Sequence, residues 1–182
     1  MLSKTLPGTN IGYEDYEETF NKYRRMVEVT GGLSLGQICA ITGLQTSTIQ
    51  NWVKRSYVPH PENKKYFERH ISRILLISAL KDCMNIEDVG ELMVLINGDT
   101  DDQTDDIVDE TRLYDHLCRI IYELDFSDLE DSRIEEVIEK VISEEKRYRK
   151  KLATALKVMT YAYVSGICSR KTGAYLQKLR KE

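Results

Sequence analysis

Polar and basic side chains are interleaved with apolar ones between residues 46 and 55 of this 182-residue chain. Ile49, Trp52 and Val53 recur at helical spacing, so a helix over this segment turns them inward and leaves the polar set outward. Side-chain amides in such a set can bond the edge of an adenine, hydroxyls can bond bases or phosphates, and cations can reach guanine or phosphate. The outward residues are Thr46, Ser47, Gln50, Asn51, Lys54 and Arg55.

The residues before this helix predict a second helix and a tight turn. Ser34 is placed to cap a short helix over 33–43, Gly43 supplies the turn, and Thr46 or Ser47 can cap the helix that follows. Two helices joined in this way form a helix-turn-helix, whose second helix presents its exposed face to the major groove of DNA. The competing interpretation is an ordinary solvated helix face, and the turn glycine with the basic segment that follows favours DNA.

The segment after the polar helix cannot be helical throughout, because it contains Pro59 and Pro61. A loop or small β-wing over 56–65 fits it better. Basic residues follow the prolines and extend into the next predicted helix. We expect Ser47, Gln50 and Asn51 to read base edges. We expect phosphate contacts from Lys54, Arg55, Lys64, Lys65, Arg69 and Arg73, with Tyr66 beside them.

Helical periodicity continues through most of the remaining chain. An aromatic stripe over 13–29 predicts a helix whose aromatic side chains pack in a core, and residues 67–80 and 86–96 predict two more amphipathic helices. Few prolines and many charged residues also favour helices. The fold class is therefore all-α, with a winged helix-turn-helix and its small β-wing at 33–98. Residues 1–32 form a helical arm before it.

The rest of the chain predicts a helical domain over 111–182, separated from the winged segment by an acidic linker over 99–110. One helix is expected over 108–124. A second, long helix is expected from about 131 to 164, where apolar residues approximate a 3.5-residue seam. The seam allows either a coiled coil or packing within the domain. Gly166 and Gly173 weaken a continuous helix beyond that point.

Charge is strongly segregated along the chain, although the net charge is only −4. Residues 45–84 contain seven Lys/Arg and three Asp/Glu, a net +4, and residues 85–142 contain four and nineteen, a net −15. Residues 143–182 contain eleven and three, a net +8. Because phosphate binding depends on a local basic surface, the acidic total does not exclude a nucleic-acid partner. The basic end of the chain is most simply a solvated surface.

The sequence gives little support for catalysis, a metal or a cofactor. It contains no glycine-rich phosphate loop and no G-x-S-x-G turn. The four cysteines lack C-x-x-C spacing, and the three histidines form no i, i+4 pair with another ligand type. No apolar run approaches twenty residues, and residues 1–10 lack the features of a signal peptide. We expect a cytoplasmic non-enzyme without metal, cofactor or membrane association.

The ordered set of these segments resembles the MerR family of winged-helix regulators over about 60 residues. Residues 35–44 resemble that family's first helix and turn, with Cys39 at a small buried position. The resemblance further rests on Thr48-Ile49, on Trp52, on Val58-Pro59 and Lys65-Tyr66 in the wing, and on residues 80–92 in the closing helices. It implies duplex DNA as the partner, a recognition helix near 46–55 and a basic wing near 57–66.

The chain departs from that family at several points. Gln50 replaces an arginine that is common in the recognition helix, and Ser56 replaces the glycine expected before the wing. The tail has no metal-sensing cysteine pair. As a whole, the chain is similar to an uncharacterised family of Gram-positive bacteria that joins such a headpiece to its own helical tail.

These observations predict a DNA-binding transcriptional regulator. A headpiece of this size binds weakly alone, so a homodimer on a near-palindromic site is expected, with the tail serving dimerisation or receiving a small-molecule or protein effector. The alternative is a helical protein-interaction adaptor that keeps the helix-turn-helix shape without binding DNA. The net acidity supports that alternative.

Overall fold

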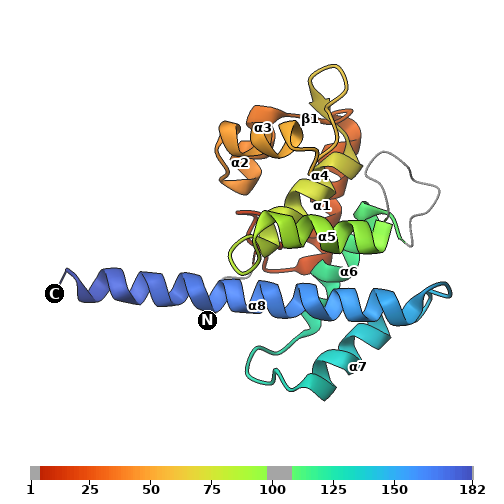
Figure 1. Cartoon of the computed structure of the whole chain (residues 1–182), viewed down its shortest axis with the longest axis vertical. Helices are drawn as coiled ribbons and strands as arrows, with labels where there is room; N and C mark the ends of the chain where they lie inside the picture. Colours follow the sequence, from red (N-terminus) through yellow and green to blue (C-terminus); the bar gives the residue numbers. More distant parts are fainter. Residues whose placement is uncertain (1–4, 98–107, 182) are drawn as a thin grey trace.

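The fold is described from a computed structural model, which defines residues 5–97 and 108–181. In this part of the chain, helices predominate and one short antiparallel sheet is present, as expected for an all-α protein (Figure 1). None of the described helices has the length and apolar character needed to cross a lipid bilayer. The elements are α1 (Tyr16–Val29), β1 (Leu33–Ser34), α2 (Leu35–Thr42), α3 (Thr46–Lys54), β2 (Lys65–Tyr66), α4 (Glu68–Leu80), α5 (Ile86–Asn97), α6 (Glu110–Glu123), α7 (Asp131–Val141) and α8 (Arg149–Leu179).

Helix α4 lies at the centre of the molecule. Every residue from His70 to Leu80 is buried, including the polar Ser72, Arg73 and Ser78. The sequence indicated one apolar face on α4, and that face is buried as expected. The opposite face is buried as well, because α6 and α8 also contact α4. The amphipathic pattern of α4 therefore understates how deeply it is buried.

Helix α1 begins one turn later than the pattern predicted, because Asp15 caps it by accepting a hydrogen bond from the Glu18 amide. Its stripe of Tyr16, Phe20 and Tyr23 is buried, which confirms that these aromatics belong to the core. Near its end, Lys65 Nζ donates to the Thr30 carbonyl at 2.8 Å. Helix α1 thus extends from α6, where Tyr16 stacks on Tyr122, to the pair of strands β1 and β2.

The headpiece and the tail share one hydrophobic core, in which buried side chains of α4, α6 and α8 belong to a single cluster. Most of the predicted acidic linker lies outside the described residues. Its last residues are not a linker, since Val108 is buried, Asp109 caps α6 and Glu110 is the first residue of that helix. The tail therefore packs directly against the headpiece.

The prediction of one long helix from about 131 to 164 is wrong. The chain breaks after α7, and Tyr148 takes a left-handed φ of 52° before α8 begins. The apolar residues of the predicted seam then face each other within the chain, because α7 packs against α8. Ile134, Ile138, Leu152 and Met159 are each at most 1% exposed, so packing within the domain replaces the coiled coil.

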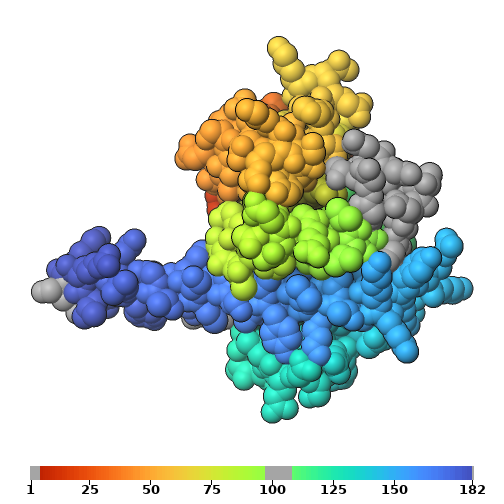
Figure 2. Space-filling model, in the orientation of Figure 1, coloured from red at the N-terminus to blue at the C-terminus, as the bar shows by residue number. Residues whose placement is uncertain are grey.

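Helix α8 continues to Leu179 through both glycines that were expected to weaken it. At Gly166 a Cβ atom would lie 3.1 Å from Asp82 Cβ, so this glycine allows close contact with the turn after α4. All residues from 168 to 181 are exposed. In Figures 1 and 2 this part of the helix projects well beyond the rest of the molecule.

Candidate nucleic-acid interface

Helices α2 and α3 are joined by a turn that local hydrogen bonds define. Ser34 caps α2 in a capping box with Gln37, as its position predicted. Gly43 ends α2 in the left-handed region at φ 72°. Gln45 precedes α3 without a side-chain cap, so the predicted capping by Thr46 or Ser47 is wrong; both belong to the first turn of α3. The sequence located the turn correctly and placed the N-cap one or two residues too late.

The two faces of α3 have the character that the sequence indicated. Ile49 is fully buried, and Trp52 and Val53 are 6% and 7% exposed. The opposite face is exposed and contains all six predicted polar or basic residues: Thr46, Ser47, Gln50, Asn51, Lys54 and, at the C-cap, Arg55. Packing of the apolar face against the core holds this polar face outward. Cys39 on the neighbouring α2 is only partly buried, contrary to expectation, with Sγ 3.9 Å from Thr46 Oγ1.

A tight β-turn projects beside α3 and forms the tip of the predicted wing. Glu62 and Lys65 exchange backbone hydrogen bonds of 3.0 and 2.8 Å. Asn63 and Lys64 between them have φ of 50° and 64°, as in a type I′ turn. After the turn, β2 pairs antiparallel with β1, with Tyr66 opposite Leu33. Lys64 is therefore exposed in this turn, and the hairpin projects at the top of Figure 1.

A groove of about 430 Å³ separates α3 from this hairpin. Gln50 lines it from the helix and Lys64 lines it from the turn, with Val53, His60 and Tyr66 also contributing. The groove brings a side chain that can read a base edge close to one that can contact a phosphate. These two positions are fourteen residues apart in sequence, and the fold brings them together.

The four exposed cations of this surface differ in how they are held. Lys54 and Lys64 form no ion pair within the described residues. Arg55 contacts Glu87 Oε1 at 2.6 Å and lies over the Tyr57 ring at 4.9 Å, and this pairing lowers the pKa of Glu87. Lys65 is fixed to the Thr30 carbonyl. Lys54 and Lys64 are thus the cations with least to lose on contacting a phosphate.

Three of the predicted contacts are buried or held in an internal ion pair. Tyr66 is 4% exposed, and burial raises the pKa of its hydroxyl. Arg73 is 3% exposed, and Arg69 is 21% exposed. Both arginines pair at 2.8 Å with Glu110, which is completely buried at the start of α6. Tyr66 and Arg73 are therefore too buried to contact DNA, and Arg69 is already held in an ion pair with a buried carboxylate.

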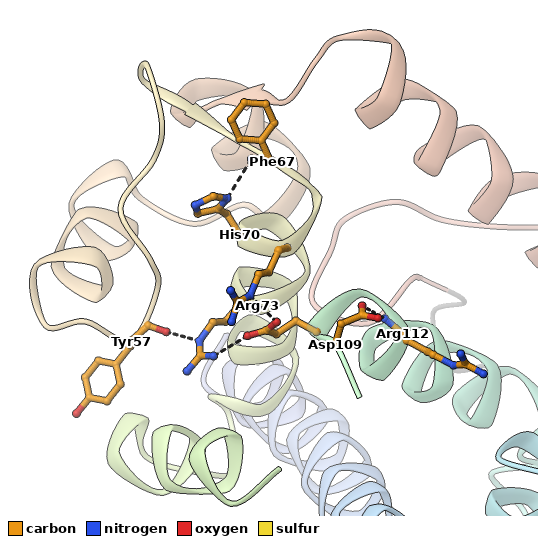
Figure 3. A network of polar contacts seen from close by, with 8 residues as sticks. Tyr57, Phe67, His70, Arg73, Asp109 and Arg112 are labelled. Atoms are coloured by element: carbon orange, nitrogen blue, oxygen red, sulfur yellow. Dashed lines mark hydrogen bonds and ion pairs between the residues drawn. The ribbon is translucent and has the colours of Figure 1, made fainter. Parts of the chain in front are cut away.

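Instead, Arg73 connects the candidate interface to the tail. Its Nε donates at 2.7 Å to the carbonyl of Tyr57, just after α3, while its Nη1 contacts Glu110 of α6 (Figure 3). Sequence reasoning missed this role because Glu110 belongs to an acidic stretch that reads as solvated. A basic residue on a strongly apolar helix was the available signal, since such a residue needs a partner when the helix is buried.

A histidine fixes the base of the hairpin. His70 is buried; its Nδ1 accepts from the Phe67 amide at 3.2 Å and its Nε2 lies 3.1 Å from the His60 carbonyl (Figure 3). The two contacts suit a neutral ring with its proton on Nε2. The loop before the hairpin is therefore tied to the start of α4.

Comparison with known proteins finds a similarity between this region and a family without an assigned role. Residues 33–117 match the family described as "Domain of unknown function (DUF1836)". This match extends past the headpiece into α6, in agreement with the contact between α4 and α6. The chain is also similar to the "Uncharacterized protein YkrK" of Bacillus subtilis (strain 168), with 26% identity over 131 residues. That alignment covers 68% of this chain and 56% of the relative. No solved structure matches the chain.

Proposed function

We propose that this protein is a DNA-binding transcriptional regulator whose residues 33–98 act as a winged helix-turn-helix resembling that of the MerR family. One observation carries the proposal: the polar face of α3 and the Lys64 turn border the same groove. A helix with a basic loop at its side is the arrangement that allows base edges and the neighbouring phosphates to be contacted together.

The exposed groups have distinct roles in this proposal. The major groove of B-DNA is about 12 Å wide and admits one helix. Gln50 and Asn51 then face base edges, with the hydroxyls of Thr46 and Ser47 at the N-terminal end of the helix. Lys54, at the end of α3, and Lys64, at the hairpin tip, contact phosphates of the DNA backbone beside the major groove.

We also propose that the protein binds DNA as a homodimer through α8. Its projecting part exposes apolar side chains, with Tyr175 72%, Leu176 46% and Leu179 68% exposed. Tyr175 and Leu179 lie four residues apart on one helix face, which is typical of a pairing surface. Two headpieces together supply the phosphate contacts that one small basic surface lacks.

The DNA proposal is tested by selecting bound sequences from random duplexes with the full-length protein, followed by binding assays at several salt concentrations. The double variant Lys54→Ala/Lys64→Ala loses two phosphate contacts per headpiece. We expect binding to weaken about tenfold or more for all sequences, and the log–log salt slope to fall by about two units per headpiece. Gln50→Ala is expected to relax the preference at a single base pair by about 1–3 kcal/mol.

The matched control is Lys146→Ala/Arg147→Ala, which removes the same charge from exposed positions in the turn before α8. It should leave binding close to that of the unmodified protein. An equal loss in both double variants would indicate attraction by net charge alone. Absence of any salt-dependent complex would instead favour the protein-interaction adaptor.

Dimerisation is tested by light scattering of the full chain and of Leu176→Glu/Leu179→Glu. These residues are exposed, so the substitution leaves the fold intact, as circular dichroism should verify. We expect a dimer to become a monomer, because charges are costly within an apolar helix pair. A monomeric unmodified protein, or an unchanged dimer in the variant, would contradict this interface.

A further inference from the structure

A pocket of about 360 Å³ lies between α1, α6 and the turn that joins α7 to α8. Its apolar wall includes Tyr16 and Phe20, whose rings stack with centroids 5.5 Å apart. Its polar wall includes Arg24, Asp115 and Arg119. A volume of this size suits a small molecule. The pocket is remote from the candidate interface, and none of the proposed DNA contacts lines it.

Two opposite charges in this pocket are poorly paired. Asp115 is 30% exposed, and its contact with Arg24 is 3.4 Å long. Arg119 reaches Glu17 only at 3.6 Å. Charge-assisted hydrogen bonds are typically about 2.7–2.9 Å, so both contacts are loose. Partial burial raises the pKa of Asp115 to about 6 despite the opposing effect of Arg24, so the neighbouring cations do not fully offset the cost of desolvating this carboxylate.

Three other charged side chains at the pocket, Arg112, Lys140 and Glu145, are already in short ion pairs. Glu145 Oε1 lies 2.5 Å from Arg112 and 2.9 Å from His116, and Lys140 contacts Glu123 at 2.5 Å. Burial lowers the pKa of His116. The lining residues include four Asp/Glu and four Lys/Arg, so their formal charges balance. A ligand with a net charge would upset this balance, whereas a zwitterion would preserve it.

We propose that this pocket binds a free α-amino acid, with the ligand's carboxylate on Arg119, its ammonium on Asp115 and its side chain toward Tyr16 and Phe20. Asp115 and Arg119 are separated by one turn of α6, and side chains at this spacing are neighbours. The ligand exchanges two long ion pairs for two short ones. An α-amino acid joins its carboxylate and ammonium through a single carbon, so the two groups can reach two neighbouring side chains together.

The pocket is connected to the hairpin through α1. Arg24, besides facing Asp115, contacts Glu68 at the start of α4 at 3.3 Å. At the far end of α1, the Thr30 carbonyl holds Lys65 of the strand pair. A bound amino acid that replaces Arg24 beside Asp115 leaves Arg24 with Glu68 as its partner. The contact between α1 and the start of α4 then changes. This regulatory consequence rests on the proposed DNA-binding function, whereas the binding site itself does not.

Binding is tested without DNA, by following backbone amide shifts in NMR spectra of the full-length protein. The twenty common L-amino acids are added separately, and the best is compared with its carboxamide and its N-acetyl form. We expect saturable shifts around Asp115 and Arg119 for at least one amino acid. Each modified form lacks one of the two charges and should bind at least about tenfold more weakly. Shifts that extend to Lys65 would support the connection through α1, and shifts confined to the pocket would overturn it.

Two variants assign the two charges. The Asp115→Asn variant should bind the amino acid as weakly as the unmodified protein binds the N-acetyl form. The Arg119→Gln variant should bind it as weakly as the unmodified protein binds the carboxamide. The control is Arg133→Gln, an arginine of α7 that contacts Glu136 and does not line the pocket. Folding of each variant is visible in the same spectra. The proposal is overturned if no amino acid gives saturable shifts, if the modified forms bind equally well, or if all three variants weaken binding alike.

Discussion

The exposed surface formed by α3 and the hairpin differs instructively from the contact between α4 and α6. Both contain basic residues that sequence reasoning assigned to phosphate binding. Lys54 and Lys64 are exposed and form no ion pair within the described residues. Arg73, nineteen residues beyond Lys54, is 3% exposed and held by a completely buried Glu110. Local charge along the sequence therefore did not distinguish a surface cation from an internal one.

The physical basis of this difference is solvation. A lysine at the surface stays hydrated and exchanges water for phosphate at little cost. A guanidinium inside the protein has lost that water, so it needs a nearby carboxylate and further hydrogen bonds. The carbonyl of Tyr57 and the carboxylate of Glu110 supply these for Arg73. The exposed cations are thus available for binding a partner, and the buried one maintains the join between headpiece and tail.

The largest expected effect comes from breaking the buried contact. Glu110→Ala leaves the charge of Arg73 buried beside that of Arg69 without their shared carboxylate. We expect a loss of about 3–5 kcal/mol in the free energy of unfolding, which urea denaturation measures. Glu136→Ala, which removes an exposed partner of Arg133, should be close to neutral. Equal stability of the two variants would show that the α4–α6 contact does not depend on this carboxylate.

A second substitution concerns Asp115, a half-buried carboxylate whose nearest cation is 3.4 Å away. Burial raises the pKa of Asp115 to about 6, so the folded protein retains this proton between pH 4 and 6, where the unfolded chain has lost it. Ionised Asp115 therefore reduces stability as the pH rises through this range. Asp115→Asn should stabilise the protein by roughly 2 kcal/mol at pH 7.5, with the gain disappearing toward pH 4.

Asp125→Asn is the control for this prediction. The Ser127 amide lowers the pKa of Asp125, so this carboxyl contributes to stability when it is ionised. Its replacement should slightly destabilise the protein at pH 7.5, in the opposite direction to Asp115→Asn. Thermal unfolding at both pH values measures both variants. A destabilised Asp115→Asn at pH 7.5 would mean that the contact with Arg24 outweighs the cost of burial.

The smallest expected effect is at the hairpin tip, where two substitutions of Lys64 should differ in stability but not in DNA affinity. Lys64 has a φ of 64°, a conformation that glycine adopts without strain. Lys64→Gly should be more stable than Lys64→Ala by about 1 kcal/mol, while both lose the same proposed phosphate contact. Denaturation and DNA titration of the two variants therefore give different rankings. If DNA affinity followed stability instead, the contribution of Lys64 would be to shape the hairpin and not to supply charge.

Elements with local signals were predictable from the amino-acid sequence alone. The Ser34 cap, the turn at Gly43 and the apolar triplet Ile49, Trp52 and Val53 defined two short helices and the exposed face of the second. These features were predictable because capping, left-handed turns and helical periodicity depend on neighbours within a few residues.

Which charges are buried and where the long helices end depend instead on contacts between distant parts of the chain. Tyr148 breaks the predicted seam without proline or glycine, because α7 folds back to cover α8. Gly166 marks a close contact with Asp82 and not a helix end. Arg73 and Glu110 meet across thirty-seven residues. Each outcome depends on which surfaces pack against one another. Packing removes water from charged groups, and this desolvation cost cannot be read from neighbouring residues in the sequence.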